Sequence, residues 1–173
     1  MDVFVEQLIV KKGNSRDLLI KSLVVMVQSA IVFLSIYFIM FLSAFIIPIL
    51  VGSFYGFWYI NTAMNIEFEY SVTNGYVTVD QIAGKRKRKR LVAFESREVE
   101  AFGIFRPELL GNSGYKTKLL VGSSMKAEQL WYAVFSTQKT GRTILVFEPE
   151  QRVLDAIKPA LPRQVAIDAF GRN

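Results

Sequence analysis

A long uncharged stretch constrains this chain more than any other feature. No Asp, Glu, Lys or Arg occurs from Ser22 to Ile66, and most residues there are apolar. A helix rises about 1.5 Å per residue and the core of a bilayer is about 30 Å thick, so about 20 apolar residues make one crossing. The stretch is too long for one crossing, and it therefore predicts a transmembrane helical hairpin over residues 18–62.

The hairpin needs two helices of near-minimal length. We expect the first at about Leu18–Phe38 and the second at about Ser43–Ile60, with a tight turn near Ile39–Leu42. Cytoplasmic flanks of membrane helices are enriched in Lys and Arg. Cations lie before or in the first turn of the first helix and after the second helix, and none lies between the two helices: Lys11, Lys12, Arg16 and Lys21, then Lys85–Arg90. We therefore expect a multi-pass protein of the cell membrane with both termini in the cytoplasm. A cleaved signal peptide is the competing interpretation, but the apolar stretch is too long for one.

Three residues of the hairpin are candidates for helix packing. Gly52 and Gly56 form a GxxxG pair, which allows another helix to approach closely. We favour packing against the chain's own first helix, near Ser29 or Gln28, over homodimerisation. Gln28 is an amide in an apolar helix, so its side chain should face protein rather than lipid.

The segment before the hairpin, residues 1–17, is predicted to be cytoplasmic or interfacial. Phe4, Val5, Leu8 and Ile9 have helix-like spacing, which favours a short amphipathic element at the membrane surface. An added edge strand for the following domain is the alternative.

Beyond Ile66 the apolar pattern changes to period two, which is typical of strands. Phe68, Tyr70 and Val72 alternate with polar residues, and Asn74-Gly75 then predicts a hairpin into a return strand at residues 76–81. Five more strands are expected at Arg90–Glu95, Glu98–Phe105, Lys118–Val121, Leu130–Thr137 and Arg142–Phe147. Residues 106–117 read as a loop.

A single helix is expected to close this domain, which spans residues 66–162. It begins at Pro149 and ends at Pro162, or sooner at Pro159. Its apolar face comprises Val153, Leu154, Ile157 and Leu161. Residues 163–173 are expected to form a C-terminal tail.

Seven short antiparallel strands capped by a C-terminal helix resemble a pleckstrin-homology-like (PH-like) barrel or sandwich. The fold class is thus α+β, with a transmembrane hairpin in front of a PH-like domain. The whole order is similar to an uncharacterised family of small bacterial two-span membrane proteins with a bacterial PH-like cytoplasmic domain. The stretches that carry this resemblance are Glu67–Gly75, Gly84–Leu91 and Ala156–Arg163. The resemblance implies architecture and localisation, but no reaction and no site residues.

The only concentrated chemical signal is the basic run, Lys85, Arg86, Lys87, Arg88, Lys89 and Arg90. Its six charges equal the whole net charge of +6, so the rest of the chain sums to zero. The run sets membrane topology and guards an edge strand, binds acidic lipid headgroups, or binds an acidic protein or RNA. Nucleic acid is the poorer partner, because no aromatic platform accompanies the charge and Tyr76 and Phe94 are expected in the core.

Residue types argue against catalysis. The chain has no Cys and no His, which excludes disulfides, Cys or His zinc sites, and Cys or His catalysis. Asp80, Glu95, Glu98 and Glu100 are expected to be solvated carboxylates on outer faces. We therefore predict no catalytic residue, no metal site and no cofactor. The expected function is a non-enzymatic membrane-anchored binding or scaffold protein, and the alternative is a structural or regulatory subunit of a larger membrane complex. Lipids and a homodimer or another membrane protein are the expected partners.

Overall fold

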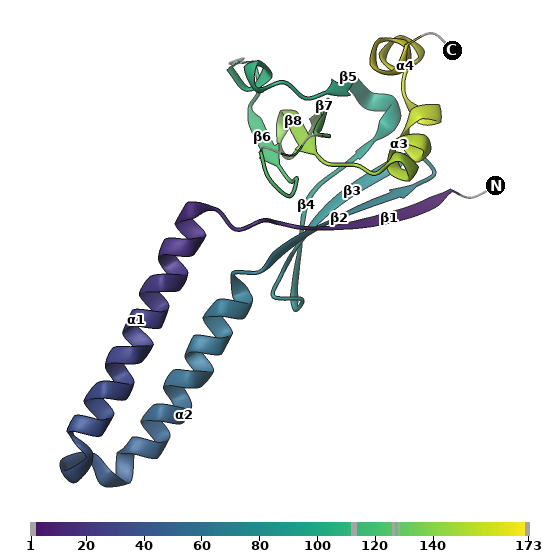
Figure 1. The fold of residues 1–173 in the computed structure, drawn as a ribbon. Helices are drawn as coiled ribbons and strands as arrows, with labels where there is room; N and C mark the ends of the chain where they lie inside the picture. The colour runs from purple at the N-terminus through teal and green to yellow at the C-terminus, as the bar shows by residue number, and fades with distance from the viewer. Residues whose placement is uncertain (1–2, 112–113, 126, 128, 172–173) are drawn as a thin grey trace. The chain divides into compact units, whose positions relative to one another are not determined.

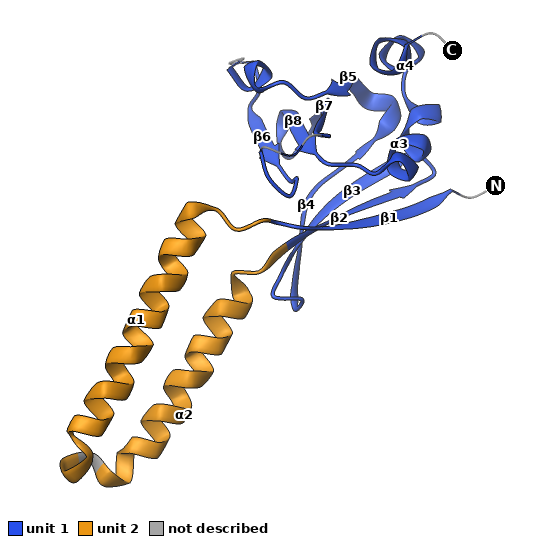
Figure 2. Ribbon diagram, in the orientation of Figure 1, with its two compact units in different colours: residues 1–11, 67–173 blue, residues 12–66 orange. Residues whose placement is uncertain are grey.

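The computed structural model describes residues 3–111, 114–125, 127 and 129–171, with the side chain of Leu42 excepted. The chain forms two compact units (Figure 2). One unit is residues 12–66, and the other combines residues 1–11 with residues 67–173. The first unit is therefore an insertion in the sequence of the second.

The inserted unit is a helical hairpin. Helix α1 spans Ser15–Tyr37 and helix α2 spans Ile39–Ala63. Asn14 caps α1, because its backbone N–H donates to Asp17 while its own side chain accepts from the first turn. The predicted turn at Ile39–Leu42 is wrong: only Phe38 separates the helices. No polar residue, Gly or Pro marks the turn, so the sequence could not locate it.

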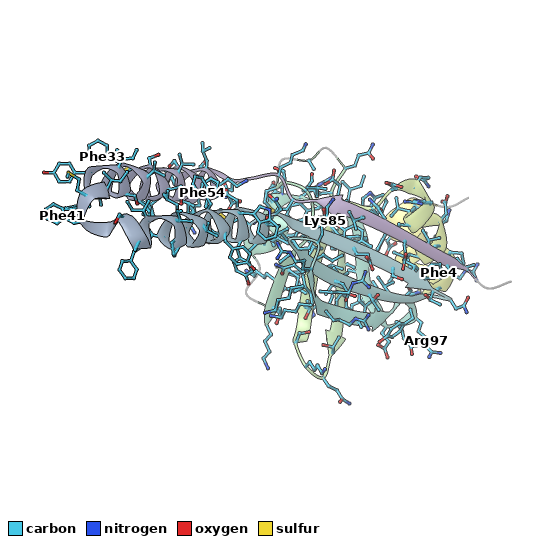
Figure 3. All side chains as sticks on the ribbon, turned by 90° about the horizontal axis from the view of Figure 1, so that it is seen from below. Phe4, Phe33, Phe41, Phe54, Lys85 and Arg97 are labelled. Atoms are coloured by element: carbon cyan, nitrogen blue, oxygen red, sulfur yellow. The ribbon has the colours of Figure 1, made fainter. Side chains whose placement is uncertain are left out.

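Both helices are long and apolar enough to cross a membrane, over Ser15–Tyr37 and Ser43–Ala63. Their apolar side chains project outward, as Phe33, Phe41 and Phe54 do in Figure 3. Phe41 is 86% exposed. Exposed apolar surface of this extent is typical of sites that contact a membrane or another protein.

The other unit contains two four-stranded sheets (Figure 1). Sheet A has the order β1-β2-β3-β4, with β1 at Phe4–Val10, β2 at Ile66–Thr73, β3 at Tyr76–Ala83 and β4 at Lys87–Glu95. Asn74 and Gly75 join β2 to β3 with φ angles of 50° and 83°, the left-handed values that a two-residue hairpin turn requires. The Asn-Gly hairpin is therefore confirmed.

The predicted amphipathic helix in the N-terminal segment is wrong, and the alternative edge strand is right. Strand β1 pairs antiparallel with β2, from Phe4 opposite Thr73 to Val10 opposite Glu67. Alternate residues of β1 face the interior, including the buried Gln7. Despite its helix-like spacing, the segment forms a strand, because it pairs with the edge of β2 and every second side chain is at least partly buried. Residues 1 and 2 lie outside the described part of the chain.

Sheet B has the order β5-β7-β8-β6, with β5 at Val99–Ile104, β7 at Trp131–Thr137, β8 at Gly141–Phe147 and β6 at Thr117–Leu120. Strand β6 runs parallel to β8. The prediction of seven antiparallel strands is thus corrected to eight strands with one parallel pair, among the residues described. A short 3-10 helix, η1 at Ser96–Glu98, leads from β4 into β5.

The main core lies between the sheets. Phe94 of sheet A stacks on Phe135 of sheet B at 3.9 Å between ring centroids. The buried Tyr70 hydroxyl donates to the carbonyl of Val121 at 2.5 Å and accepts from the backbone N–H of Glu148 at 3.3 Å. Tyr70 therefore joins the sheets through polar contacts as well as packing.

A second apolar cluster covers other residues of sheet B. Its buried members are Phe105, Leu130, Val134, Ile144 and Val146. Leu109, Leu110 and Tyr115 pack against it from the insert that the sequence treats as a loop, and η2 at Pro107–Gly111 forms part of this insert. Residues 112 and 113 of the insert lie outside the described residues.

The C-terminal region closes the unit. Helix α3 spans Gln151–Ile157 and continues as η3 at Lys158–Ala160, so the predicted helix ends early, as Pro159 allowed. Its predicted apolar residues are buried: Val153, Leu154, Ile157 and Leu161.

The expected tail instead contains helix α4, Arg163–Phe170. Phe170 stacks on Trp131 at 5.3 Å and on Phe102 at 5.9 Å, which holds α4 against sheet B. Residues 172 and 173 are not described.

Candidate functional site

The basic run begins in the turn between β3 and β4 and continues along β4. Gly84 and Lys85 have left-handed φ angles of 59° and 58°, and the backbone N–H of Arg86 donates to the carbonyl of Ala83. All six side chains of the run are exposed. Strand β4 is an edge strand of sheet A. The run is therefore solvent-exposed and lies on an edge of the sheet.

The run lies at a particular end of sheet A. Strand β1 ends at Val10, opposite Glu67 near the start of β2. Because β2 and β3 are joined at the other end by Asn74-Gly75, β3 returns and finishes at Ala83 beside this pair. Figure 1 shows the β3–β4 turn at this end, and in Figure 3 Lys85 and Phe4 lie at opposite ends of the sheet. The chain thus leaves sheet A for the helical unit at the end that carries the basic turn.

Strand pairing divides the run between two faces. Arg90 lies opposite Asp80 and Arg88 lies opposite Ile82, so these arginines share the face that carries Asp80. Lys87 and Lys89 alternate with them and project from the other face. A bulge at the next residue, between the Asp80–Arg90 and Val79–Val92 pairs, ends this arrangement.

The two arginines of β4, Arg88 and Arg90, form the arginine pair, which covers a buried carboxylate. Arg90 Nε donates to Asp80 Oδ1 at 2.9 Å, and an Arg88 nitrogen lies 4.0 Å from Asp80 Oδ2. Arg88 also donates to Glu69 at 2.5 Å. The hydrogen bond to Asp80, and then the charge of that carboxylate, raise the pKa of Arg90.

Asp80 is only 4% exposed, so the expectation of a solvated carboxylate is wrong at this position. A buried carboxylate is costly without partners, and the arginine pair supplies them. The burial of Asp80 could have been predicted only from the pairing of β3 with β4, which places Arg90 opposite it.

Three exposed lysines of the run, Lys85, Lys87 and Lys89, form the lysine set. Neither an ion pair nor a side-chain hydrogen bond of these lysines is found within the described part of the chain. The two sets therefore differ: two charges of the arginine pair are balanced by Asp80 and Glu69, whereas the charges of the lysine set face solvent.

The other carboxylates examined in the sequence lie apart from the run. Glu100 accepts from Arg142 Nε at 2.7 Å and from the Ser136 hydroxyl at 2.8 Å, and these contacts lower its pKa. Glu95 pairs with Arg97, and Glu98 is exposed. The structure does not bring these groups together with Asp80.

The aromatic expectations near the run are half right. Phe94 is buried, but Tyr76 is 45% exposed, so its assignment to the core is wrong. Tyr76 lies opposite Glu95, at the end of β3 away from the basic turn. It therefore adds no stacking platform beside the cations.

In the helical hairpin, Gln28 Nε2 donates to the Ser53 hydroxyl at 3.1 Å, so this amide does face protein. A Cβ placed on Gly52 or Gly56 would meet no atom within 4 Å outside its own helix turn. The favoured packing of these glycines against α1 is therefore not found. Their surface is open within the hairpin, and a role in binding another helix stays a prediction.

Two packed four-stranded sheets are followed by C-terminal helices, and two helices long and apolar enough to cross a membrane interrupt the chain after its first strand. With the family match given next, this architecture is that of a PH-like domain protein. More narrowly, the chain belongs to the family described as Bacterial PH-like domain (DUF6106), whose model matches residues 1–167. This match includes β1 and the hairpin as well as the two sheets. Comparisons with curated proteins and with solved structures give no match.

Proposed function

We propose that this chain is a non-enzymatic, membrane-anchored binding or scaffold protein. Helices α1 and α2 cross the cell membrane, both termini are cytoplasmic, and the PH-like domain contacts acidic lipid headgroups of the inner leaflet through the basic run. The observation that carries the proposal is the position of the basic turn at the end of sheet A where the chain departs for the hairpin.

Chain connectivity supports this arrangement. Only the short segment Lys11–Asn14 joins β1 to α1, and Met64 and Asn65 join α2 to β2. A residue spans at most about 3.6 Å, so the paired residues Val10 and Glu67 hold both helix ends on one side of a bilayer. The cations of the run then stand near the headgroups, where each gains about 1 kcal/mol on an anionic surface.

The test uses the full chain, because truncation at Glu67 would remove β1. The chain has no Cys, so Ala83→Cys provides a single site for a fluorescent label beside the basic turn. The labelled protein is placed in nanodiscs of phosphatidylcholine with or without phosphatidylglycerol, together with nitroxide-labelled lipid. We expect stronger quenching with phosphatidylglycerol than without it, and loss of this difference when Lys85–Arg90 are replaced by serine in a variant whose melting curve verifies the fold.

A matched control replaces exposed cations elsewhere, with Lys139→Ser and Arg163→Ser, and should keep the quenching. Equal quenching in both lipid mixtures, or in the serine variant, would overturn lipid binding by the run. Protease mapping that places the two termini on opposite sides of the membrane would overturn the anchor itself.

A second candidate function is a structural or regulatory subunit of a larger membrane complex. Two observations favour it: the open surface at Gly52 and Gly56, and the edge strand β1, whose Phe4, Leu8 and Val10 are at least half exposed. Crosslinking in native membranes should then give discrete bands that contain a second protein, and Gly52→Leu with Gly56→Leu should weaken them. Absence of such bands would speak against this candidate.

A further inference from the structure

We propose that the basic run contains two functionally distinct sets, in which the lysine set binds the phosphate of an anionic lipid headgroup and the arginine pair has a structural role. This inference rests on the proposed function and assigns its residues. The sequence alone presents six equivalent cations, and the division becomes visible only through the register of β3 and β4.

The arginine pair is committed to the protein. Arg88 and Arg90 contact Asp80 and Glu69, and the two positive charges balance the two negative ones. Asp80 is buried, so loss of these arginines would leave an uncompensated carboxylate. A headgroup phosphate would have to compete with Asp80 and Glu69 for the same guanidinium groups.

The lysine set is free to bind a ligand. Lys85 lies in the turn, and Lys87 and Lys89 project from the face of β4 that does not carry Asp80. Residues two apart on a strand are about 7 Å apart, so both ammonium groups can reach one phosphate or two neighbouring headgroups. Compact, flexible ammonium groups suit phosphate without fixed geometry.

The lysine set and the arginine pair should contribute differently to docking of the domain on an anionic leaflet. Each cation near an anionic leaflet favours the docked state about fivefold, so the three lysines together favour it about a hundredfold. The arginine pair adds little to docking, because Asp80 and Glu69 cancel its charge within a Debye length of about 10 Å.

Acetylation of lysines tests the inference directly in the full chain. Nanodiscs contain either phosphatidylcholine alone or phosphatidylcholine with phosphatidylglycerol, and mass spectrometry follows acetylation by a water-soluble reagent. With phosphatidylglycerol we expect the reaction at Lys85, Lys87 and Lys89 to slow about fivefold or more, whereas Lys139 reacts at an unchanged rate. Lys139 is exposed on the same domain and serves as an internal control.

A variant then separates the two sets. Arg88→Gln and Arg90→Gln are combined with Asp80→Asn and Glu69→Gln, so that neither carboxylate is left unpaired and the net charge is unchanged, and a melting curve verifies the fold. Persistent lysine protection supports the inference. Loss of protection in this folded variant would place the arginines in the binding site and overturn the division, while lipid binding by the run would stand.

The other outcomes identify the source of the phosphate. Equal acetylation of the wild-type lysines in both lipid mixtures would overturn the proposed function and this inference together. Inorganic phosphate added to phosphatidylcholine nanodiscs should give no protection. Protection by inorganic phosphate as strong as that by phosphatidylglycerol would overturn the lipid headgroup as the ligand.

Discussion

The side-chain carbonyl of Gln7 accepts a hydrogen bond of 2.7 Å from the backbone N–H of Glu150, which lies 143 positions further along the chain. The amide nitrogen of the same side chain donates to the carbonyl of Glu148 at 3.0 Å. Gln7 is 3% exposed, so water does not replace these contacts. The first strand is therefore fastened to the connection between β8 and α3.

Replacement of Gln7 by alanine should destabilise the domain by about 1–3 kcal/mol, because a buried N–H and a buried carbonyl lose their partners. Denaturant unfolding of the full chain in detergent measures this difference. Glu6→Ala, at the neighbouring exposed position, should change stability by less than about 0.5 kcal/mol. Equal effects of the two substitutions would show that the Gln7 contacts do not stabilise the domain.

The hairpin should be removable without loss of the domain, because Val10 and Glu67 are paired neighbours in sheet A. Replacing residues 11–66 by Asn-Gly converts β1 and β2 into an ordinary hairpin. We expect a soluble protein with a cooperative melting transition. A chain that begins at Glu67 lacks β1 and Gln7, and it should be markedly less stable; equal stability of the two would contradict the importance of β1.

Tyr70 should make stability fall at alkaline pH. Burial raises the pKa of its phenol above the ordinary value near 10. The folded state therefore holds this proton more tightly than the unfolded state. The contribution of Tyr70 to stability is thus constant below about pH 10 and decreases above it by up to about 1.4 kcal/mol per pH unit.

Unfolding measured at about pH 8 and about pH 11 separates this effect from the titration of other groups. Tyr70→Phe should cost about 1–3 kcal/mol at the lower pH, because the Val121 carbonyl loses its donor. The same variant should lose less stability than wild type between the two pH values. An identical alkaline decrease in both proteins would refute the role of Tyr70.

The arginine pair should stabilise the domain, and Lys87 and Lys89 provide a matched comparison from the same strand. Arg88→Gln with Arg90→Gln should cost about 1–2 kcal/mol, since both arginine side chains are more than half exposed while Asp80 is buried. Lys87→Gln with Lys89→Gln should cost less than about 0.5 kcal/mol.

Adding Asp80→Asn to the arginine double variant should restore part of the lost stability, because the buried Asp80 carboxylate is then no longer left unpaired. The free energies of unfolding of the three variants test whether Arg88 and Arg90 have a structural role. A larger loss from the lysine variant than from the arginine variant would contradict the assignment of Arg88 and Arg90 to a structural role.

Local signals predicted much of the fold. Period-two patterns located the strands after Ile66. Asn74-Gly75 located the turn between β2 and β3, because Asn and Gly adopt left-handed φ angles more readily than other residues. The buried face of α3 was also readable from helical spacing.

Features that depend on contacts between distant parts of the chain could not be predicted from the sequence. The pairing of β1 with β2 depends on segments separated by the whole hairpin, and its residues Phe4, Val5, Leu8 and Ile9 fit a helical spacing as well as a strand. The register that pairs Asp80 with Arg90 depends on a bulge, and no residue type at that point of the sequence predicts a bulge. Helix α4 depends on the stacking of Phe170 on distant aromatic rings.

The insertion of the hairpin between two paired strands imposes an order on biosynthesis. The ribosome delivers β1 first, and this strand has no partner until both helices and then β2 have emerged. In the membrane arrangement that we propose, a chain in which only one helix crossed would leave β1 and β2 in different compartments, unable to complete sheet A. Under that proposal, a chain that carries the hairpin must insert both helices before its domain can fold, and misinserted copies would expose unpaired strands to proteases and chaperones.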